Sequence, residues 1–391
     1  MHITWFGLYC GLMLSISAFS IDIILPAFPG VSAGIGASSQ QVQLIVPVYL
    51  IALGLAHPLF GALSDFYGRK IIIYLGLVVF CLGALACLVS TSLNTLLAGR
   101  FLQGVGAASG AVVCRAMIRD RFSGSELAQN MAVASMFFAI GPVLAPLIGY
   151  LIYDSVGWRG IFVFLIVFAV AMALATSKQT ETLAPEFRRR TGLREMIQGF
   201  ALVYRHPQSR FFILVGAACT CLIVTFLEHA QVVYEQLGAD SRRFSYLFAF
   251  SSAGIIAGQI LNYKLISLSG AVVAMRVGAS VVAGTSFLIM VAVFGGVLTD
   301  ITMTLLMLAF HTSYLIIYAN IVSLALDPHR ERAGTAAAVI GFTGYVMGSV
   351  FAAMITFIVG EDLGRWSVCF FLTALSIFLS VFLWKTGNKK A

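Results

Sequence analysis

Residues 61–91, GALSDFYGRKIIIYLGLVVFCLGALACLVST, join a short polar turn to a long apolar run. The run from Ile71 to Thr91 carries no charged residue and is long enough to cross about 30 Å of hydrocarbon as a helix. Only helices and closed barrels satisfy all their backbone groups in lipid, and the run lacks the alternation of a barrel strand. The stretch therefore predicts a transmembrane helix that follows a turn at the membrane surface.

The composition extends this prediction to the whole chain. Of its 391 residues, 60% are hydrophobic and 10% are charged, whereas about a quarter of the residues of a soluble domain are charged. All seven cysteines lie within apolar runs, so their spacing indicates neither a disulfide framework nor a metal site. We predict an all-α polytopic membrane protein.

Twelve apolar segments are separated by polar breaks. They cover residues 3–26, 43–64, 71–91, 93–114, 128–152, 158–177, 211–234, 245–265, 274–297, 300–325, 334–359 and 366–384. The interval 178–210 is the one long polar stretch between them. We therefore predict an N-terminal six-helix half (1–177), a cytoplasmic central loop (178–210) and a C-terminal six-helix half (211–391).

The basic residues give the orientation. If the N-terminus is cytoplasmic, 19 of the 24 Lys and Arg residues lie on the cytoplasmic side, as the positive-inside rule predicts. The exceptions are Arg159, Arg242, Arg243 and Arg365 outside and Arg100 within a span. We expect a multi-pass protein with both termini cytoplasmic. Its net charge of +8 is expected to face the anionic headgroups of the lipid bilayer, so no nucleic-acid partner is needed to explain it.

The turn at residues 61–70 has a specific pattern. Asp65 is expected to accept hydrogen bonds from a neighbouring helix N-terminus, while Arg69 and Lys70 are expected to anchor at the headgroups. Together with Gly61 and Gly68 they form GALSDFYGRK, which resembles the G-x-x-x-D-(R/K)-x-G-R-(R/K) signature of the major facilitator superfamily.

One position departs from that signature, because Phe66 stands where a basic residue is usual. Further segments support the resemblance: RFLQGVG at 100–106, GPVLAPLIG at 141–149, and D-x-x-L-P-A-x-P from Asp22. With Arg119-Asp120, WRGIF at 158–162, ETLAPE at 181–186 and AGTA at 333–336, they resemble the Bcr/CflA branch, the bicyclomycin- and chloramphenicol-resistance drug:proton antiporters.

The resemblance implies the twelve-helix major facilitator fold and export of drugs or small amphipathic metabolites across a bacterial inner membrane, driven by proton entry. We expect neither enzyme activity nor a bound cofactor or metal. The proton gradient is the expected energy source. A dedicated exporter of an endogenous metabolite or siderophore stays open, as do, more remotely, a proton-coupled importer and a membrane sensor. We expect a monomer that binds a small-molecule substrate and protons. At Gly141 and Pro142 the resemblance places the bent, closely packed helix of antiporters.

Three ionisable residues within apolar runs are candidates for proton coupling. Asp22 lies 17 residues beyond Trp5, or about 25 Å along a helix, and Arg100 lies about 10 Å into a span that enters from outside. The two are therefore expected to lie at similar depth and to pair, with Arg100 controlling the pKa of Asp22. The alternative is that Asp22 caps the end of its helix at the wet interface.

Glu228 is the counterpart of Asp22 in the second half, because it lies 17 residues beyond Phe211. In a two-half repeat the first helices of the halves are equivalent. Exposure of Glu228 at the outer edge is the alternative.

Aromatic and polar residues give candidates for the substrate cavity. His311, Tyr314 and Tyr318 share one helix face by their spacing, and Tyr49 lies in the second span. Ordinary packing of an aromatic stripe is the alternative.

Overall fold

The computed structural model describes residues 4–188 and 193–384. Within them every regular element is helical. The predicted cytoplasmic positions of the two chain ends fall outside these residues, as do residues 189–192 of the predicted central loop.

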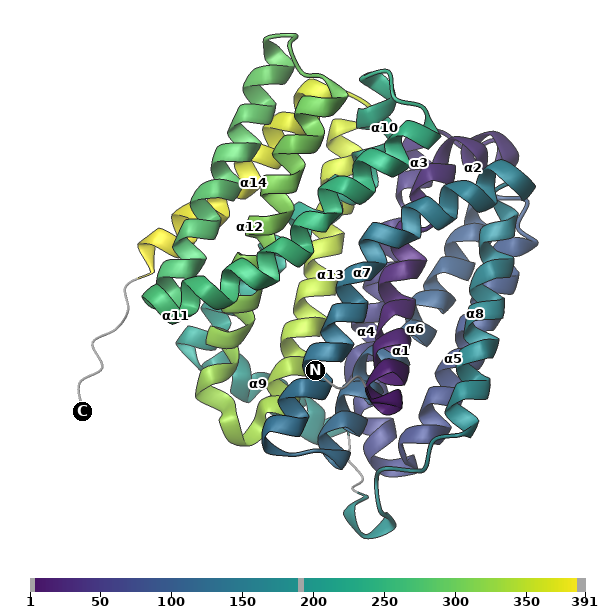
Figure 1. Ribbon diagram of the computed structural model, residues 1–391, viewed down its shortest axis with the longest axis vertical. Coiled ribbons are helices and arrows are strands. Elements are labelled where there is room, and N and C mark those ends of the chain that lie inside the picture. The colour runs from purple at the N-terminus through teal and green to yellow at the C-terminus, as the bar shows by residue number, and fades with distance from the viewer. Residues whose placement is uncertain (1–3, 189–192, 385–391) are drawn as a thin grey trace.

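The helices before residue 178 form one side of the molecule in Figure 1, in purple to blue. They are α1 (Trp5–Asp22), η1 (Leu25–Ala27), α2 (Phe28–Ile35), α3 (Ser39–Gln43), α4 (Ile45–Tyr67), α5 (Arg69–Leu88), α6 (Leu93–Arg121), α7 (Gly124–Val156) and α8 (Arg159–Ser177). The first span, α1 with η1 and α2, runs to Ile35, nine residues beyond the predicted end at Pro26. The helices of this group pack in the pairs α5–α6, α4–α6 and α1–α7.

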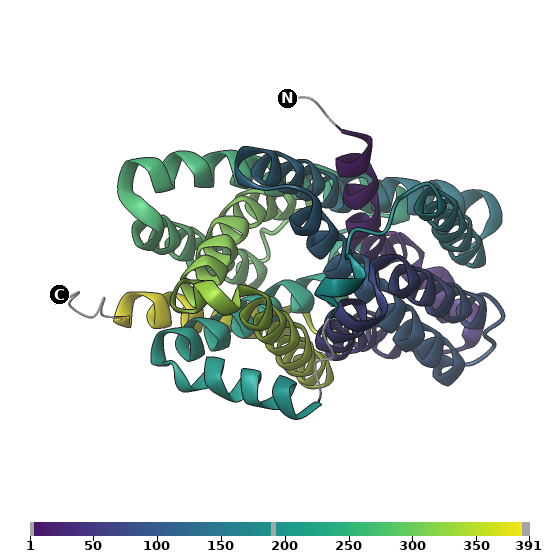
Figure 2. The ribbon, with the colours of Figure 1, turned by 90° about the horizontal axis from the view of Figure 1, so that it is seen from below.

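The helices after residue 206 form the other side, in green to yellow, as the view from below in Figure 2 also shows. They are α10 (Pro207–Gln236), α11 (Ser241–Phe294), α12 (Asp300–Leu326), η3 (Asp327–Arg332), α13 (Ala333–Val359) and α14 (Leu363–Leu383). The two groups meet where α4 packs on α13 and α7 packs on α11. The predicted domain boundaries stay a prediction.

Eleven helices of the described chain are long and apolar enough to cross a membrane, and one of them, α11, is long enough to cross twice. Its 54 residues would extend about 80 Å as a straight helix, far more than a bilayer core. At Gly270 the backbone leaves the helical region, with φ 81° and ψ 165°, between the predicted spans 245–265 and 274–297. A positive φ costs little for glycine alone. The turn at Gly270 therefore yields the twelfth span.

The predicted central loop contains helices that the sequence interpretation did not include: η2 (Pro185–Phe187) and α9 (Leu193–Arg205). Helix α9 packs on α13, with the Phe200 and Phe342 ring centroids 5.4 Å apart and a hydrogen bond between the Tyr204 and Thr343 hydroxyls. The signal was present in the sequence, because Met196, Phe200, Val203 and Tyr204 recur at helical spacing.

Candidate functional site

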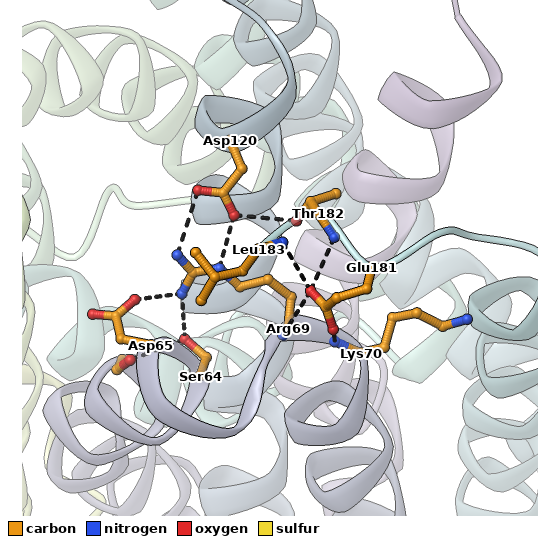
Figure 3. Close-up of polar contacts among 9 residues, drawn as sticks. Ser64, Asp65, Arg69, Lys70, Asp120, Glu181, Thr182 and Leu183 are labelled. Atoms are coloured by element: carbon orange, nitrogen blue, oxygen red, sulfur yellow. Dashed lines mark hydrogen bonds and ion pairs between the residues drawn. The ribbon is translucent and has the colours of Figure 1, made fainter. Parts of the chain in front are cut away.

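Arg69 is the centre of an ion-pair network at the α9 end of the molecule (Figure 3). Its Nε donates to Asp120 Oδ2 at 2.8 Å, and its Nη1 donates to Ser64 Oγ at 2.8 Å and to Asp65 Oδ1. The Arg69 side chain is buried, so it ties the end of α4 and the start of α5 to the end of α6. The prediction that Arg69 anchors at lipid headgroups is therefore wrong.

Glu181, in the loop after α8, caps the N-terminus of α5 (Figure 3). Its carboxylate accepts from the backbone N–H groups of Arg69 and Lys70, each at 3.0 Å, and from those of Thr182 and Leu183. Partial burial raises the pKa of the Glu181 carboxyl, but these four donors outweigh burial and hold the pKa below its ordinary value. The carboxylate at the helix N-terminus is thus Glu181, and the prediction that assigned this role to Asp65 is wrong.

The two glycines of the motif have different surroundings. Gly68 has φ 101°, and a Cβ there would lie 2.9 Å from Glu181 Oε2, so glycine leaves room for the cap. Gly61 lines a cavity that is described below. Lys70 Nζ lies 3.5 Å from the Ser177 carbonyl oxygen, at the end of α8.

Arg100, on α6, is fully buried and bonds to neutral groups. Its Nη1 donates to Ser20 Oγ at 3.0 Å and to Gln103 Oε1 at 2.9 Å, and its guanidinium lies 4.5 Å from the centroid of the Tyr49 ring. Tyr49 is buried too, and its hydroxyl donates to the Ser17 carbonyl. Tyr49 therefore supports Arg100 within the first group of helices.

Asp22 is 4% exposed and is not paired with Arg100. Within the described parts of the chain no cation lies within 4 Å of its carboxylate. Ser20, which does contact Arg100, is two residues from Asp22, so the two side chains point to nearly opposite sides of α1. The expected Asp22–Arg100 pair is absent, and the span runs on for 13 residues to Ile35 instead of ending near Asp22.

Glu228, on α10, is fully buried. Its Oε2 accepts a hydrogen bond from the Thr356 hydroxyl on α13, while its Oε1 has no hydrogen-bond partner. Glu228 thus belongs to the interior and not to the outer edge. Helix α10 begins at Pro207, so Glu228 lies 21 residues from the helix start, and the equal offset expected with Asp22 is not reproduced.

The three residues of the aromatic row have different surroundings. His311 is 2% exposed; its Nδ1 is 3.1 Å from the Ser251 carbonyl oxygen, and its ring packs on Phe226 and Phe248. Tyr314 and Tyr318 are half-buried and stack at 5.9 Å. His311 is thus a packing residue between α10, α11 and α12, whereas the tyrosines lie nearer to a free surface.

The predicted conformational residues Gly141 and Pro142 lie within α7 where it crosses α1. A Cβ at Gly141 would lie 3.3 Å from the Ala18 Cβ, and Pro142 interrupts the helix ladder. The small residue at 141 therefore leaves room for the close approach of α1 to α7, and the conformational role of Gly141 and Pro142 stays a prediction.

A cavity of about 230 Å³ opens between α4, α6, α9 and α13. We call it the α9-side cavity; its lining includes His57, Gly61, Asp65, Arg69, Arg115, Arg119, Glu195, Phe200, Gly334 and Thr335. The sequence interpretation missed Arg115 as a cavity residue, because it directly follows the predicted span 93–114 and was assigned to the headgroup region. It also missed the cap that Glu181 provides to the backbone at Arg69 and Lys70, and the bonds of Ser20 and Gln103 to Arg100 and of Thr356 to Glu228.

Comparisons with known proteins agree with this geometry. A family model described as the Major Facilitator Superfamily matches residues 10–353. The bicyclomycin resistance protein homolog of Haemophilus influenzae is 27% identical over 90% of this chain and 88% of its own. The multidrug resistance protein MdtL of Citrobacter koseri is 27% identical over 90% of each chain.

Among solved structures, the E. coli xylose transporter XylE in a partially occluded inward-open conformation superposes with a TM-score of 0.76. It is 14% identical and covers 98% of each chain, so the likeness concerns the fold alone. These findings confirm the predicted fold class and the resemblance seen in the sequence.

Proposed function

Because the chain belongs to the major facilitator superfamily, and is thus a multi-pass transporter and not an enzyme, we propose that it exports drugs or small amphipathic metabolites in exchange for protons. It does so as a monomer in a bacterial inner membrane, with both termini cytoplasmic and the proton gradient as its energy source. The names of the relatives support the drug class.

The observation that carries the proposal is a pair of buried acids, one on each side of the molecule, that have no cationic partner among the described residues. Asp22 lies on α1 and Glu228 on α10, and each is at most 4% exposed. Ionisable residues inside a membrane are costly and mark proton relays and transport paths. A carboxylate that lacks a counter-ion avoids this cost when it takes up a proton, which suits a proton carrier.

The arrangement of the halves supports alternating access. At the α2–α3 end the halves are tied together, since Gln40 Nε2 on α3 donates to the Thr356 carbonyl on α13 at 2.9 Å. At the opposite end the α9-side cavity lies between them. Thr356 links the tie at the α2–α3 end to Glu228, because its hydroxyl also donates to the Glu228 carboxylate. A change of protonation at Glu228 thus acts on the helix that closes the outer side.

The experiment is accumulation in inverted membrane vesicles, with and without a protonophore. The panel contains bicyclomycin, chloramphenicol, a sulfonamide, a cationic dye and a siderophore. We expect protonophore-sensitive uptake of at least one compound, and a loss of about tenfold or more in Asp22→Asn and Glu228→Gln. Asp154→Asn, which removes an exposed acid at the end of α7, serves as the matched control and is expected to keep full uptake.

Two results would contradict the proposal. Full proton-coupled uptake by Asp22→Asn and Glu228→Gln would remove the coupling role of the acids. If no panel compound were moved in a protonophore-sensitive way, the chain would fit a sensor better, and uptake in the reverse direction would identify an importer.

A further inference from the structure

The charge of the α9-side cavity is a feature that proton coupling does not use. Three arginines line it, and Arg69 is the one whose charge is matched, by Asp65 and Asp120. Arg115 and Arg119 lie one turn apart on α6 and face the same cavity. Within the described ranges 4–188 and 193–384, no carboxylate lies within 4 Å of either guanidinium.

The cavity lining carries three arginines and two acids, so its formal net charge is +1, and neither acid forms an ion pair with Arg115 or Arg119 within the described residues. Asp65 is bonded to Arg69, and Glu195 has an interaction partner of its own. Helix α13 begins at Ala333, and Gly334 and Thr335 line the cavity, so the positive end of its dipole lies at the same wall. Two arginines with no carboxylate within 4 Å among the described residues, together with a helix N-terminus, make this wall of the cavity locally positive.

Two aromatic side chains belong to the cavity lining, His57 on α4 and Phe200 on α9. Behind the lining, the Tyr345 ring on α13 packs on His57, and a Cβ at Gly344 on α13 would lie 3.9 Å from the Tyr318 hydroxyl on α12. The His57 and Tyr345 rings are 5.4 Å apart, and His57 Nδ1 lies 2.7 Å from the Leu53 carbonyl oxygen, which leaves Nε2 for the cavity. Arg115 therefore lines the same cavity as His57, on which the Tyr345 ring packs from the other group of helices.

From this arrangement we infer that the α9-side cavity binds a small amphipathic anion, with its acid group on Arg115 and Arg119 and its apolar body toward His57 and Phe200. A guanidinium fork binds a carboxylate, sulfonate or phosphate through charge-assisted hydrogen bonds, and it repels a cation. The inference rests on the proposed function and specifies its substrate class. It ranks anions above cationic dyes as cargo.

Binding to the detergent-purified full-length protein tests this without a proton gradient. Fluorescein and rhodamine 123 share a tricyclic scaffold but are anionic and cationic, and fluorescence polarisation measures the Kd of each. We expect fluorescein to bind about tenfold more tightly than rhodamine 123, and Arg115→Gln to remove most of this preference. Arg115→Lys, which keeps the charge but not the fork, should lose less.

The matched control is Arg121→Gln, which removes the same charge from the same helix outside the cavity, where Arg121 lies over the Phe6 ring. It should leave both Kd values unchanged, and thermal unfolding in detergent shows that each variant is folded. Equal binding of the two dyes, or an unchanged fluorescein Kd in folded Arg115→Gln, would overturn the inference.

A lipid headgroup has the same chemistry as a small anion, so the source needs its own comparison. In nanodiscs of phosphatidylcholine with or without phosphatidylglycerol, we expect the same fluorescein Kd. Displacement of fluorescein by phosphatidylglycerol from the unmodified protein, but not from Arg115→Gln, would assign the cavity to lipid and overturn the small-anion assignment. Since no gradient is present, failure of binding is distinguishable from failure of proton coupling.

Discussion

The Glu181 carboxylate shows how one residue sets the local structure at the α9 end. It accepts four backbone N–H groups, two of them at the start of α5, where helix N–H groups have no partner within the helix. The cap holds Arg69 in place for its bonds to Asp65 and Asp120. Loss of the charge at Glu181 is therefore expected to weaken the bonds of Arg69 to Asp65 and Asp120 as well.

Glu181→Gln is expected to lower the free energy of unfolding by about 1–2 kcal/mol, because a neutral amide is a weaker acceptor for these donors. The folded pKa of Glu181 is depressed, so its contribution is complete above the ordinary carboxyl value of about 4.3 and is lost as the pH falls below it. Thermal unfolding between pH 7 and pH 3 measures both effects.

Glu186→Gln is the control, an exposed acid of the same loop. Equal unfolding temperatures for Glu181→Gln and the unmodified protein at pH 7 would show that the cap contributes nothing.

At the residue scale the sequence predicts which charged groups are buried better than it predicts what they contact. Asp22, Arg100 and Glu228 are found because a charge in an apolar run is conspicuous. Their partners depend on helix rotation: Arg100 meets Ser20 and not Asp22 because those two residues point to opposite sides of α1. The spacing of residues within one helix does not indicate which neighbouring helix each side chain faces.

At the scale of the element, the double crossing of α11 depends on one backbone conformation. Gly270 separates two spans that otherwise form one continuous helix, and its φ of 81° is a region that side chains with a Cβ avoid. The apolar pattern predicted both spans correctly. The short, weakly polar segment between the two spans does not indicate that the helix continues on both sides of Gly270.

Gly270→Val is expected to destabilise the protein by about 1–3 kcal/mol, because a β-branched residue is strained at positive φ. The amount of folded protein after detergent extraction and the unfolding temperature measure the effect. Gly284→Ala is the matched control in the same helix, since a Cβ there meets no atom within 4 Å. An unfolding temperature as high for Gly270→Val as for Gly284→Ala would contradict the assigned role of Gly270.

At the scale of the whole molecule, the two groups of helices are joined at one end and separated at the other. The first group contributes Gln40 to the closed end, and the second contributes Thr356, which also bonds to Glu228. Composition and span count predict the all-α fold, because a helix satisfies its backbone hydrogen bonds within the bilayer, and the placement of basic residues predicts the orientation. The cavity and the closed end opposite to it depend on how the two groups of helices pack against each other. The pattern of apolar and charged residues along the chain does not specify that packing.

The central claim is exchange of protons for substrate, and proteoliposomes with a trapped pH dye test it most directly. A gradient of the panel compound with the largest protonophore-sensitive uptake is imposed with no initial pH difference. We predict proton movement opposite to the substrate, abolished in Asp22→Asn and Glu228→Gln and kept in Asp154→Asn. Substrate movement with no change of internal pH would contradict the account.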